Sequence, residues 1–285
     1  MRIAETRLRR HRFGVAGIER VDCSPNPLDA HKGRYFSIQE FVAATQFGSE
    51  TDFNKTDVSY STYYEFGKTK KYVLARNTRV GFEDSFGPNP NLGLPNCTGV
   101  LLATNATCNP VPLPERLYAG GATSHRGFGI NGAGPRDLTT GYPVGGSAAV
   151  LNSIELRLPP PTLPLVGNTI SFVIFHDMGN VFQHPSDMFK SFKNFHQPNE
   201  QTCENVTLAP GASQQNGVGN CDFRYYSHAI GTGARYNTPV GPIRLDFSYN
   251  LNPPVYPVFD DYTTNGPYVG KAGHFNFFFS IGQAF

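Results

Sequence analysis

Apolar and polar residues alternate with a period of two along most of the chain, whereas helical periodicity is nearly absent. In residues 242–252 (PIRLDFSYNLN) the apolar side chains share one strand face, and Arg244 and Asp246 lie on the other. The C-terminal segment HFNFFFSIGQAF repeats the pattern, with small or polar residues such as Gly282 opposite an apolar face. That apolar face holds Phe275, Phe277, Phe279, Ile281 and Phe285. The pattern predicts an all-β fold.

The alternation, read between turn signals, predicts about nine strands. They are expected near residues 13–23, 33–46, 54–66, 70–83, 145–158, 168–178, 222–236, 240–251 and 273–285. Many reach the roughly 9–11 residues with which a tilted strand crosses a bilayer. Short connections are expected at 24–32, 67–69, 159–167 and 237–239, and long loops at 84–144, 179–221 and 252–272, with a shorter one at 47–53. Short turns at one end and long loops at the other are typical of an antiparallel outer-membrane barrel.

A soluble β-sandwich is the alternative, because its strands also alternate between an apolar and a polar face. Sandwich strands are usually shorter, about 5–6 residues, and would not place a row of bare Phe side chains on a terminal strand. An apolar face opposite a small or polar one suits lipid outside and a wet lumen inside. The pattern therefore favours a transmembrane barrel.

Composition narrows the classes of function. The net charge of +2 is too small to indicate a nucleic-acid partner, and charged residues make up only 16% of the chain against 23 Phe and 14 Tyr. No apolar run approaches the roughly 18 residues of a transmembrane helix. The basic N-terminal stretch MRIAETRLRRHRFGVAG lacks the apolar region of a signal peptide.

The five cysteines fall into two local pairs and one single residue, Cys23. Cys97 and Cys108 share one irregular stretch, and Cys203 and Cys221 share another. Such pairs predict disulfides in an oxidising compartment, with free thiols as the alternative. The closely spaced Cys-x-x-Cys pattern of a metal site is absent from the sequence, and no metal or other cofactor is expected.

Residues 120–132 (GGATSHRGFGING) combine five glycines with a Ser-His-Arg tripeptide. Ser124 and His125 could suggest a nucleophile and its base, but sequence neighbours rarely have triad geometry and no third partner is evident. A phosphate-binding loop would need a strand before it and a helix after it. His176 and Asp177 face opposite sides of a strand, which disfavours a shared metal. We expect no catalytic residues.

Strand phase places Glu155 and Asp177 opposite the apolar residues of their segments, so both would point into the lumen from sequential strands. Two lumenal carboxylates need a cation, and the forked guanidinium of Arg126 can supply one. An ordinary solvated charge is the alternative for Arg126. Arg244 and Asp246 face the same side and either line a path or pair with each other.

Five segments, taken in order, resemble a known family. They are ERLYAGGATSHRGFG, GPRDLTTGYPVGGSAAVLNSIELRLP, FVIFHDMGNVF, GTGARYNTPVGPIRLDFSYNLN and FFFSIGQAF. They resemble the C-terminal barrel of the BamA/TamA-type outer-membrane assembly factors, the bacterial surface antigen family, over most of residues 30–285. The resemblance implies a sixteen-stranded barrel preceded by POTRA domains. This chain would supply about nine strands, the eighth to the sixteenth, without the POTRA domains and first strands, which would leave two unpaired sheet edges.

The resemblance also implies roles for particular residues. The long loop 84–144 would re-enter the barrel and be held by a latch of Arg126, Gly127 and Phe128 with Glu155 and Asp177, although His125 stands where the family often has an apolar residue. The last strand would be the sorting signal and one side of the barrel seam. Its residues are Phe275, Phe277, Phe279, Gly282 and Phe285.

The expected function is insertion or export of outer-membrane proteins by strand exchange at the seam, in a bacterial outer membrane. Expected partners are outer-membrane lipid, unfolded outer-membrane protein clients and periplasmic or lipoprotein accessory subunits. A two-partner secretion pore or a passive outer-membrane channel is the alternative.

Overall fold

Nine antiparallel strands form one sheet in the order β1-β2-β3-β4-β5-β6-β7-β8-β11. The computed structural model describes residues 16–22, 30–49, 51–68, 71–86, 111–136, 141–161, 169–201, 203, 221–236, 238, 242–258 and 268–281. The strands are β1 (Ala16–Asp22), β2 (Gly33–Ala43), β3 (Phe53–Phe66), β4 (Tyr72–Ser85), β5 (Ala148–Leu158), β6 (Ile170–Phe182), β7 (Ser227–Tyr236), β8 (Ile243–Asn250) and β11 (Phe275–Ile281). The prediction of an all-β, antiparallel fold with about nine strands in the sheet is confirmed.

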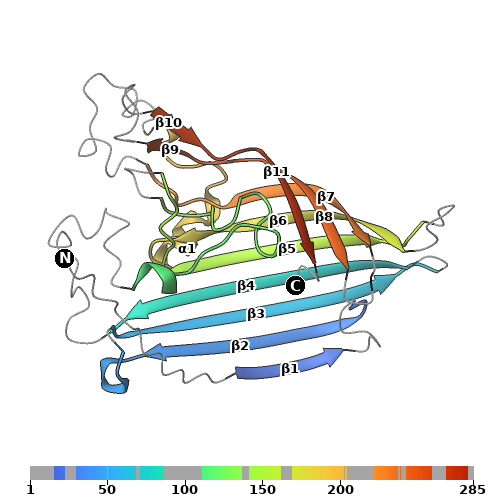
Figure 1. Cartoon of the computed structure of the whole chain (residues 1–285), viewed down its shortest axis with the longest axis horizontal. Coiled ribbons are helices and arrows are strands. Elements are labelled where there is room, and N and C mark those ends of the chain that lie inside the picture. The colour runs from blue at the N-terminus through green and yellow to red at the C-terminus, as the bar shows by residue number, and fades with distance from the viewer. Residues whose placement is uncertain are drawn as a thin grey trace, which may run out of the picture.

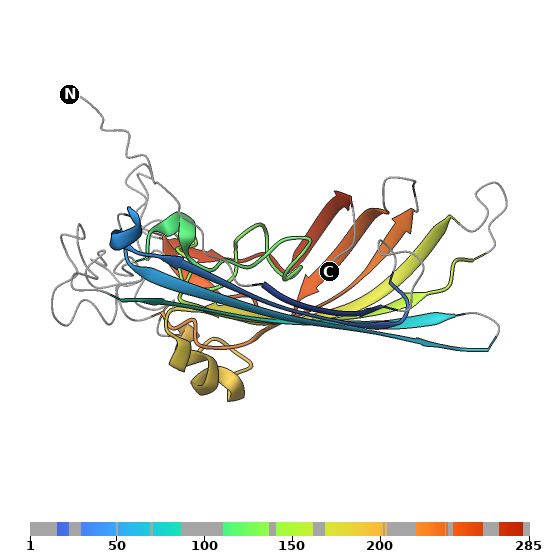
Figure 2. The same ribbon diagram turned by 90° about the horizontal axis from the view of Figure 1, so that it is seen from below.

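The sheet curves into an open trough (Figures 1 and 2). Because consecutive strands of this sheet are antiparallel, the strand ends from which the long connections β4–β5, β6–β7 and β8–β11 leave lie at one end of the sheet. The described part of the β4–β5 connection carries a short 3-10 turn, η4 (Leu113–Glu115), and its residues 111–136 lie along the concave side (Figure 2). The predicted alternation of short and long connections is therefore confirmed.

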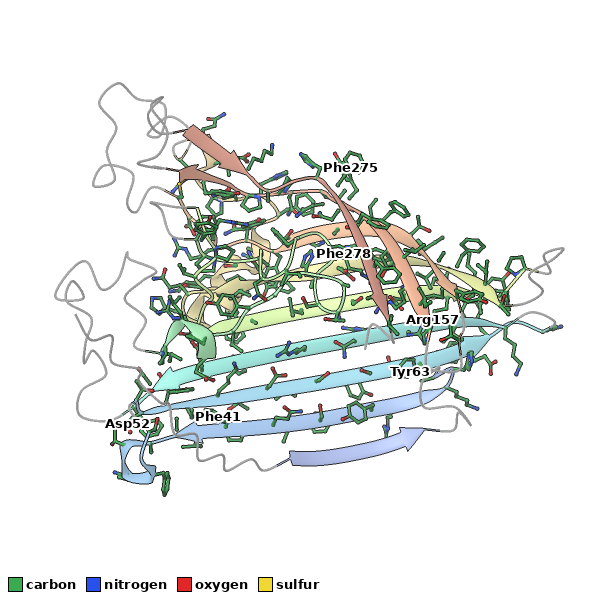
Figure 3. The ribbon with its side chains drawn as sticks, viewed as in Figure 1. Phe41, Asp52, Tyr63, Arg157, Phe275 and Phe278 are labelled. Carbon is green, nitrogen blue, oxygen red and sulfur yellow. A yellow bond between two sulfur atoms is a disulfide. The ribbon has the colours of Figure 1, made fainter. Side chains whose placement is uncertain are left out.

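The sheet is apolar on its exposed side and polar on its buried side. In β8 the side chains of Arg244 and Asp246 are buried, whereas those of Leu245 and Phe247 between them are exposed. On β11 the inward-facing Phe278 lies between exposed phenylalanines, and Figure 3 labels it together with Phe275. Exposed aromatic and aliphatic side chains continue across the convex face at Phe36, Ile38, Tyr60, Tyr64, Leu74, Phe172, Ile174, Ile230, Phe247, Phe277 and Phe279. A soluble sheet would bury such a surface.

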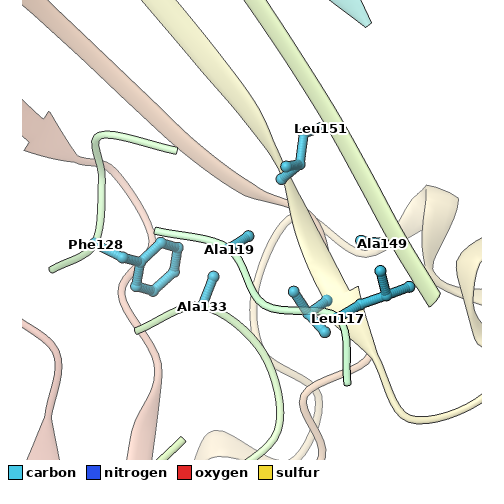
Figure 4. Close-up of a cluster of buried hydrophobic side chains, with 7 residues drawn as sticks. Leu117, Ala119, Phe128, Ala133, Ala149 and Leu151 are labelled. Carbon is cyan, nitrogen blue, oxygen red and sulfur yellow. The ribbon is translucent and has the colours of Figure 1, made fainter. Parts of the chain in front are cut away.

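Two small apolar clusters pack against the sheet, one on each face. On the concave side, loop residues Leu117, Ala119, Phe128 and Ala133 pack against strand residues Ala149, Leu151 and Val181 (Figure 4). On the convex side, Met188 of helix α1 (Pro185–Lys190) packs with Ala148, Phe182 and Tyr226. The sheet is thus the middle layer, with residues 117–133 of the β4–β5 loop inside and α1 of the β6–β7 loop outside.

Local elements in the long connections differ from the sequence-based expectation of plain loops. A hairpin of β9 (Val255–Val258) and β10 (Tyr268–Lys271) lies within 252–272, and α1 is followed by the 3-10 turn η5 (Ser191–Lys193). Another 3-10 turn, η1 (Thr45–Phe47), follows β2. Pieces of three to six residues are too short to show a hydrophobic period. No helix in the described ranges is long and apolar enough to cross a membrane.

Candidate functional site

The β4–β5 loop folds back along the sheet as an ordered hairpin-like path. Leu117 and Gly146 exchange main-chain hydrogen bonds of 3.1 and 3.0 Å, which closes the base of the path. The buried Arg116 guanidinium donates to the carbonyls of Val111 (2.9 Å) and Val144 (3.1 Å), which joins the outgoing and returning arms. These bonds carry the loop tip, residues 120–132, to the middle of the concave face.

Two of the tip glycines are required by space. Gly120 has a φ of 118°, and a Cβ there would lie 2.3 Å from the carbonyl oxygen of Gly129. A Cβ on Gly127 would lie 2.8 Å from the Cβ of Ala229 on β7. The tip therefore turns tightly and approaches the wall so closely that a side chain at either position would push it away.

The side chain of Arg126 is buried among carboxylates from β5 and β6. Its Nε and Nη2 donate to the two Asp177 oxygens, each at 2.8 Å, in a bidentate pair. Its Nη1 donates to Glu155 Oε1 at 2.6 Å, and its main-chain N–H donates to Asp177 Oδ2 at 2.9 Å. Ser153, opposite Asp177 in the β5–β6 register, accepts from Nη2 at 3.0 Å and donates to Asp177 at 2.6 Å. The structure thus brings Arg126, Glu155 and Asp177 together.

An aromatic ring completes the pocket of Arg126. The guanidinium carbon lies 3.4 Å from the centre of the Phe175 ring, a cation–π arrangement. The ring in turn covers Gly231 of β7, where an added Cβ would lie 2.3 Å from Phe175 Cζ and 2.2 Å from the Phe247 carbonyl oxygen. The missing side chain at Gly231 makes room for the ring.

Replacing Gly231 with alanine should therefore displace Phe175 or separate β7 from β8, because a backbone carbonyl cannot move alone. We expect a loss of about 1–3 kcal/mol, the usual range for overpacking a filled site. The midpoint of thermal unfolding measures it. Gly129→Ala is the matched control, since a Cβ there meets nothing within 4 Å. Equal effects of the two substitutions would contradict the packing argument.

The charge cluster extends beyond the predicted latch to β7 and β8. Asp246 lies 3.7 Å from Arg126 and pairs with both Arg235 and Arg244, the latter at 2.8 Å. Arg235 also lies 3.5 Å from Glu155. Alternation had placed Asp246 on the lumenal face, but its part in the cluster depends on the β7–β8 pairing. Arg244 pairs with Asp246, one of the two alternatives open from sequence.

The main chain of the loop tip is also hydrogen-bonded to the wall. The Arg126 carbonyl accepts from Ser248 Oγ, and the Gly127 carbonyl accepts from Asn250 Nδ2 (2.8 Å) and from Asn276 Nδ2 of β11 (3.0 Å). Phe128 is buried in the concave cluster (Figure 4). Five strands, β5, β6, β7, β8 and β11, thus contact a stretch of four residues. The sequence pattern indicates only that Asn250 and Asn276 face the lumen. It does not indicate that their amides donate to Gly127.

The β7 contact comes from His125. Its Nε2 lies 3.1 Å from the Ser227 carbonyl oxygen, which can only accept, and the Gly127 N–H donates to its Nδ1 at 3.1 Å. Both ring nitrogens are thereby used in the neutral tautomer. Burial lowers the pKa of His125; the nearby Asp177 opposes this effect, and Arg126 adds to it.

This environment predicts a pH dependence for loop seating. Because the folded pKa of His125 is depressed, the unfolded state binds more protons once the pH falls below about 6.5, the pKa of an unperturbed His. His125 therefore disfavours the folded state as the pH falls from about 6.5 towards its folded pKa, by at most about 1.4 kcal/mol per pH unit. Protease cleavage of the loop at pH 7.5 and pH 5 tests it. A His125→Gln variant should lose this part of the dependence, and an unchanged profile in that variant would contradict the assignment.

The residue pairs that could suggest a nucleophile with its base or a metal site do not come together in the structure. Ser124 Oγ accepts from the Gly120 N–H at 2.8 Å, whereas the His125 ring bonds Ser227 and Gly127. His176 lies on the convex face, 3.2 Å from His228, while Asp177 points inward. Within the described ranges, no group of three or more His, Cys, Asp or Glu residues could hold a metal ion.

Of the residues predicted for the seam strand and the disulfides, some lie in the described part of the chain and some lie outside it. On β11, Phe275, Phe277 and Phe279 are exposed on the convex face. Cys203 and Cys221 are joined in a disulfide across the β6–β7 loop. Four predicted positions lie outside the described residues, namely Cys97, Cys108, Gly282 and Phe285.

Comparison with protein families adds an independent finding. Residues 20–285 match the Omp85 superfamily domain, which spans nearly the whole chain. Proteins of this superfamily are outer-membrane β-barrels that act in protein insertion or secretion rather than as enzymes. The match agrees with the resemblance to BamA/TamA-type factors, and with it the open nine-stranded sheet is part of a transmembrane β-barrel. The chain belongs to the Omp85 superfamily.

Proposed function

We propose that this chain acts in the insertion of outer-membrane proteins in a bacterial outer membrane, and that a client strand docks on β11. The observation that carries the proposal is the position of β11. In the described sheet it pairs with β8 on one side and ends the strand order on the other. An unpaired strand edge is a template for adding another strand, with main-chain hydrogen bonds supplying affinity.

The latch supports this assignment because it reaches the same strand. Asn276 of β11 donates to Gly127, the residue after Arg126. The seated loop thereby holds β11 from the concave side, and in the described sheet the edge of β11 away from β8 has no neighbouring strand. The latch would keep the loop in place and the wall in register during client docking. Its residues are Arg126, Gly127, Phe128, Glu155 and Asp177. The exposed Phe275, Phe277 and Phe279 would face lipid beside the incoming strand.

Site-specific crosslinking tests the docking site. A photoreactive phenylalanine analogue replaces Phe279 on β11 or, as the matched control, Phe172 on the convex face of the interior strand β6. The reconstituted protein then receives an unfolded outer-membrane barrel as client. We expect client adducts at position 279 and none at 172. Equal yields at the two positions would contradict strand addition at β11.

A secretion pore or a passive channel is the second candidate, and charged residues on the concave face are the observation in its favour. The same proteoliposomes distinguish the two. Faster folding of the added client supports the insertase, whereas steady single-channel conductance without faster folding supports the pore. The expected partners are lipid, unfolded clients and periplasmic or lipoprotein accessory subunits.

A further inference from the structure

We propose that residues 185–196, in the connection between β6 and β7, anchor the protein in the headgroup region of the membrane. We define this stretch as the Phe-Lys segment; it comprises α1, η5 and Asn194, Phe195 and His196. The inference rests on the membrane location in the proposed function. It assigns a lipid contact to a loop, outside the strands that cross the bilayer.

The Phe-Lys segment is held on the convex side of the sheet. It lies opposite residues 111–136 of the β4–β5 loop, called the latch loop below (Figure 2). Met188 is buried against Ala148 and Phe182. The Tyr226 hydroxyl donates to the Met188 carbonyl at 3.2 Å, and the Tyr226 N–H donates to the Asn194 carbonyl at 3.1 Å. These bonds fix the segment at Met188 and at Asn194, so the exposed side chains between them are presented by a backbone tied to the sheet.

Three phenylalanines of the segment are exposed, although the Phe192 ring also meets the Tyr226 ring edge-on, with ring centres 6.0 Å apart. Phe189 is 80% exposed, Phe192 77% and Phe195 44%. They recur at every third position in the sequence FKSFKNF. Apolar rings in such numbers on a short, anchored segment mark an interaction surface.

Cations are interleaved with these rings. Lys190 and Lys193 are exposed, and the single acid of the segment, Asp187, is buried 3.9 Å from Lys190. The outward face thus combines aromatic rings with net positive charge. Segments of this composition lie at membrane interfaces, with rings at the boundary of the acyl chains and cations near anionic headgroups.

Continuity with the lipid-facing side of the sheet favours lipid over a protein partner. The Phe195 ring centre lies 4.9 Å from that of His228 on the convex face of β7. The neighbouring outward residues Ile230 and Ile174 are about half exposed. The rings of the Phe-Lys segment therefore extend the exposed apolar face of the barrel wall at the end where the long loops meet.

Tryptophan fluorescence provides a direct test. The 285 residues contain no Trp, so a single introduced Trp is the only indole in this chain. Phe192→Trp places it in the segment, Phe247→Trp on the convex wall and Ile130→Trp on the latch loop, where Ile130 is 84% exposed. Each full chain is reconstituted into phosphatidylcholine–phosphatidylglycerol vesicles with lipids brominated near either end of the acyl chain.

The proposal predicts blue-shifted emission of Phe192→Trp and strongest quenching by bromines near the headgroup end. Phe247→Trp should be quenched by deeper bromines, and Ile130→Trp by neither. If Phe192→Trp behaves like Ile130→Trp while Phe247→Trp is quenched, the anchor is overturned and the membrane location stands. If none of the three is quenched, the membrane location fails and the anchor with it.

The lysines are tested in the Phe192→Trp background. Quenching should be stronger in vesicles that contain anionic phosphatidylglycerol than in phosphatidylcholine alone. Lys190→Gln with Lys193→Gln should abolish that difference, whereas Lys71→Gln, an exposed lysine paired with Glu65 at the end of the sheet with short turns, should not. A difference that survives the double substitution would overturn the contact between the lysines and anionic headgroups.

Discussion

Arg126→Ala is expected to release the loop tip from the wall and to destabilise the protein by about 3–5 kcal/mol, the usual effect of removing one partner from a buried ion pair. The substitution leaves Asp177 buried without the guanidinium that now donates two hydrogen bonds to it. Glu155 suffers less, because Arg157 (3.4 Å) and Arg235 (3.5 Å) lie close to it. In the proposed function, loss of the seated loop also lowers client insertion.

Cleavage by a protease of broad specificity within residues 111–136 measures loop release, and the thermal midpoint measures stability. Arg79→Ala is the matched control, because it removes a guanidinium from the same concave face. Arg79 pairs with Asp57 but is half exposed, so its loss should cost about 0–1 kcal/mol. Adding Asp177→Asn to Arg126→Ala should recover part of the loss, since it removes the unpaired charge. A loop as resistant as in the unmodified protein would show that Arg126 does not hold it.

Asp177→Ala should cost more than Glu155→Ala, although both carboxylates contact the same arginine. Asp177 accepts two side-chain bonds and one main-chain bond from Arg126, and a fourth from Ser153. Glu155 accepts one short bond, from Arg126 at 2.6 Å, and two long ones, from Arg157 at 3.4 Å and Arg235 at 3.5 Å. We expect the Asp177 variant to lose about 3–5 kcal/mol, as for a broken buried pair, and the Glu155 variant distinctly less.

The same protease and thermal assays rank the two variants. The acid-to-amide substitutions Asp177→Asn and Glu155→Gln keep the shape and remove the charge, so they separate charge from packing. Asp177→Asn should again be more destabilising than Glu155→Gln. If the Glu155 variants proved the more sensitive, the bidentate pair would not be the centre of the latch.

The alternation of apolar and polar side chains predicts both the strands of the wall and the inward direction of Glu155 and Asp177. A strand has a period of two, so the apolar residues around Glu155 and Asp177 determine which way each carboxylate points. The glycines near Arg126 and the family resemblance indicated a re-entrant loop. The nine strand positions followed from the same pattern, with ends displaced by a few residues, as at Ala148 and Ser227.

The rest of the site depends on tertiary pairing that no local pattern encodes. Ser153 contacts Asp177 only because the β5–β6 register sets them opposite each other. Asp246 joins the cluster through β7, and Asn250 and Asn276 reach Gly127 only when β8 and β11 curve under the loop. These positions are ordinary lumenal polar residues until the sheet is assembled.

The shared acceptor at Gly127 has a thermodynamic consequence. One carbonyl binds Asn250 of β8 and Asn276 of β11, so separating these strands at that level costs the loop one of its ties. Separation of β11 from β8 and release of the loop are then linked equilibria, and linkage is reciprocal. A ligand or antibody that stabilises the seated loop should strengthen the pairing of β11 with β8 by the same free energy, and a perturbation that pulls β11 away from β8 should loosen the loop in equal measure.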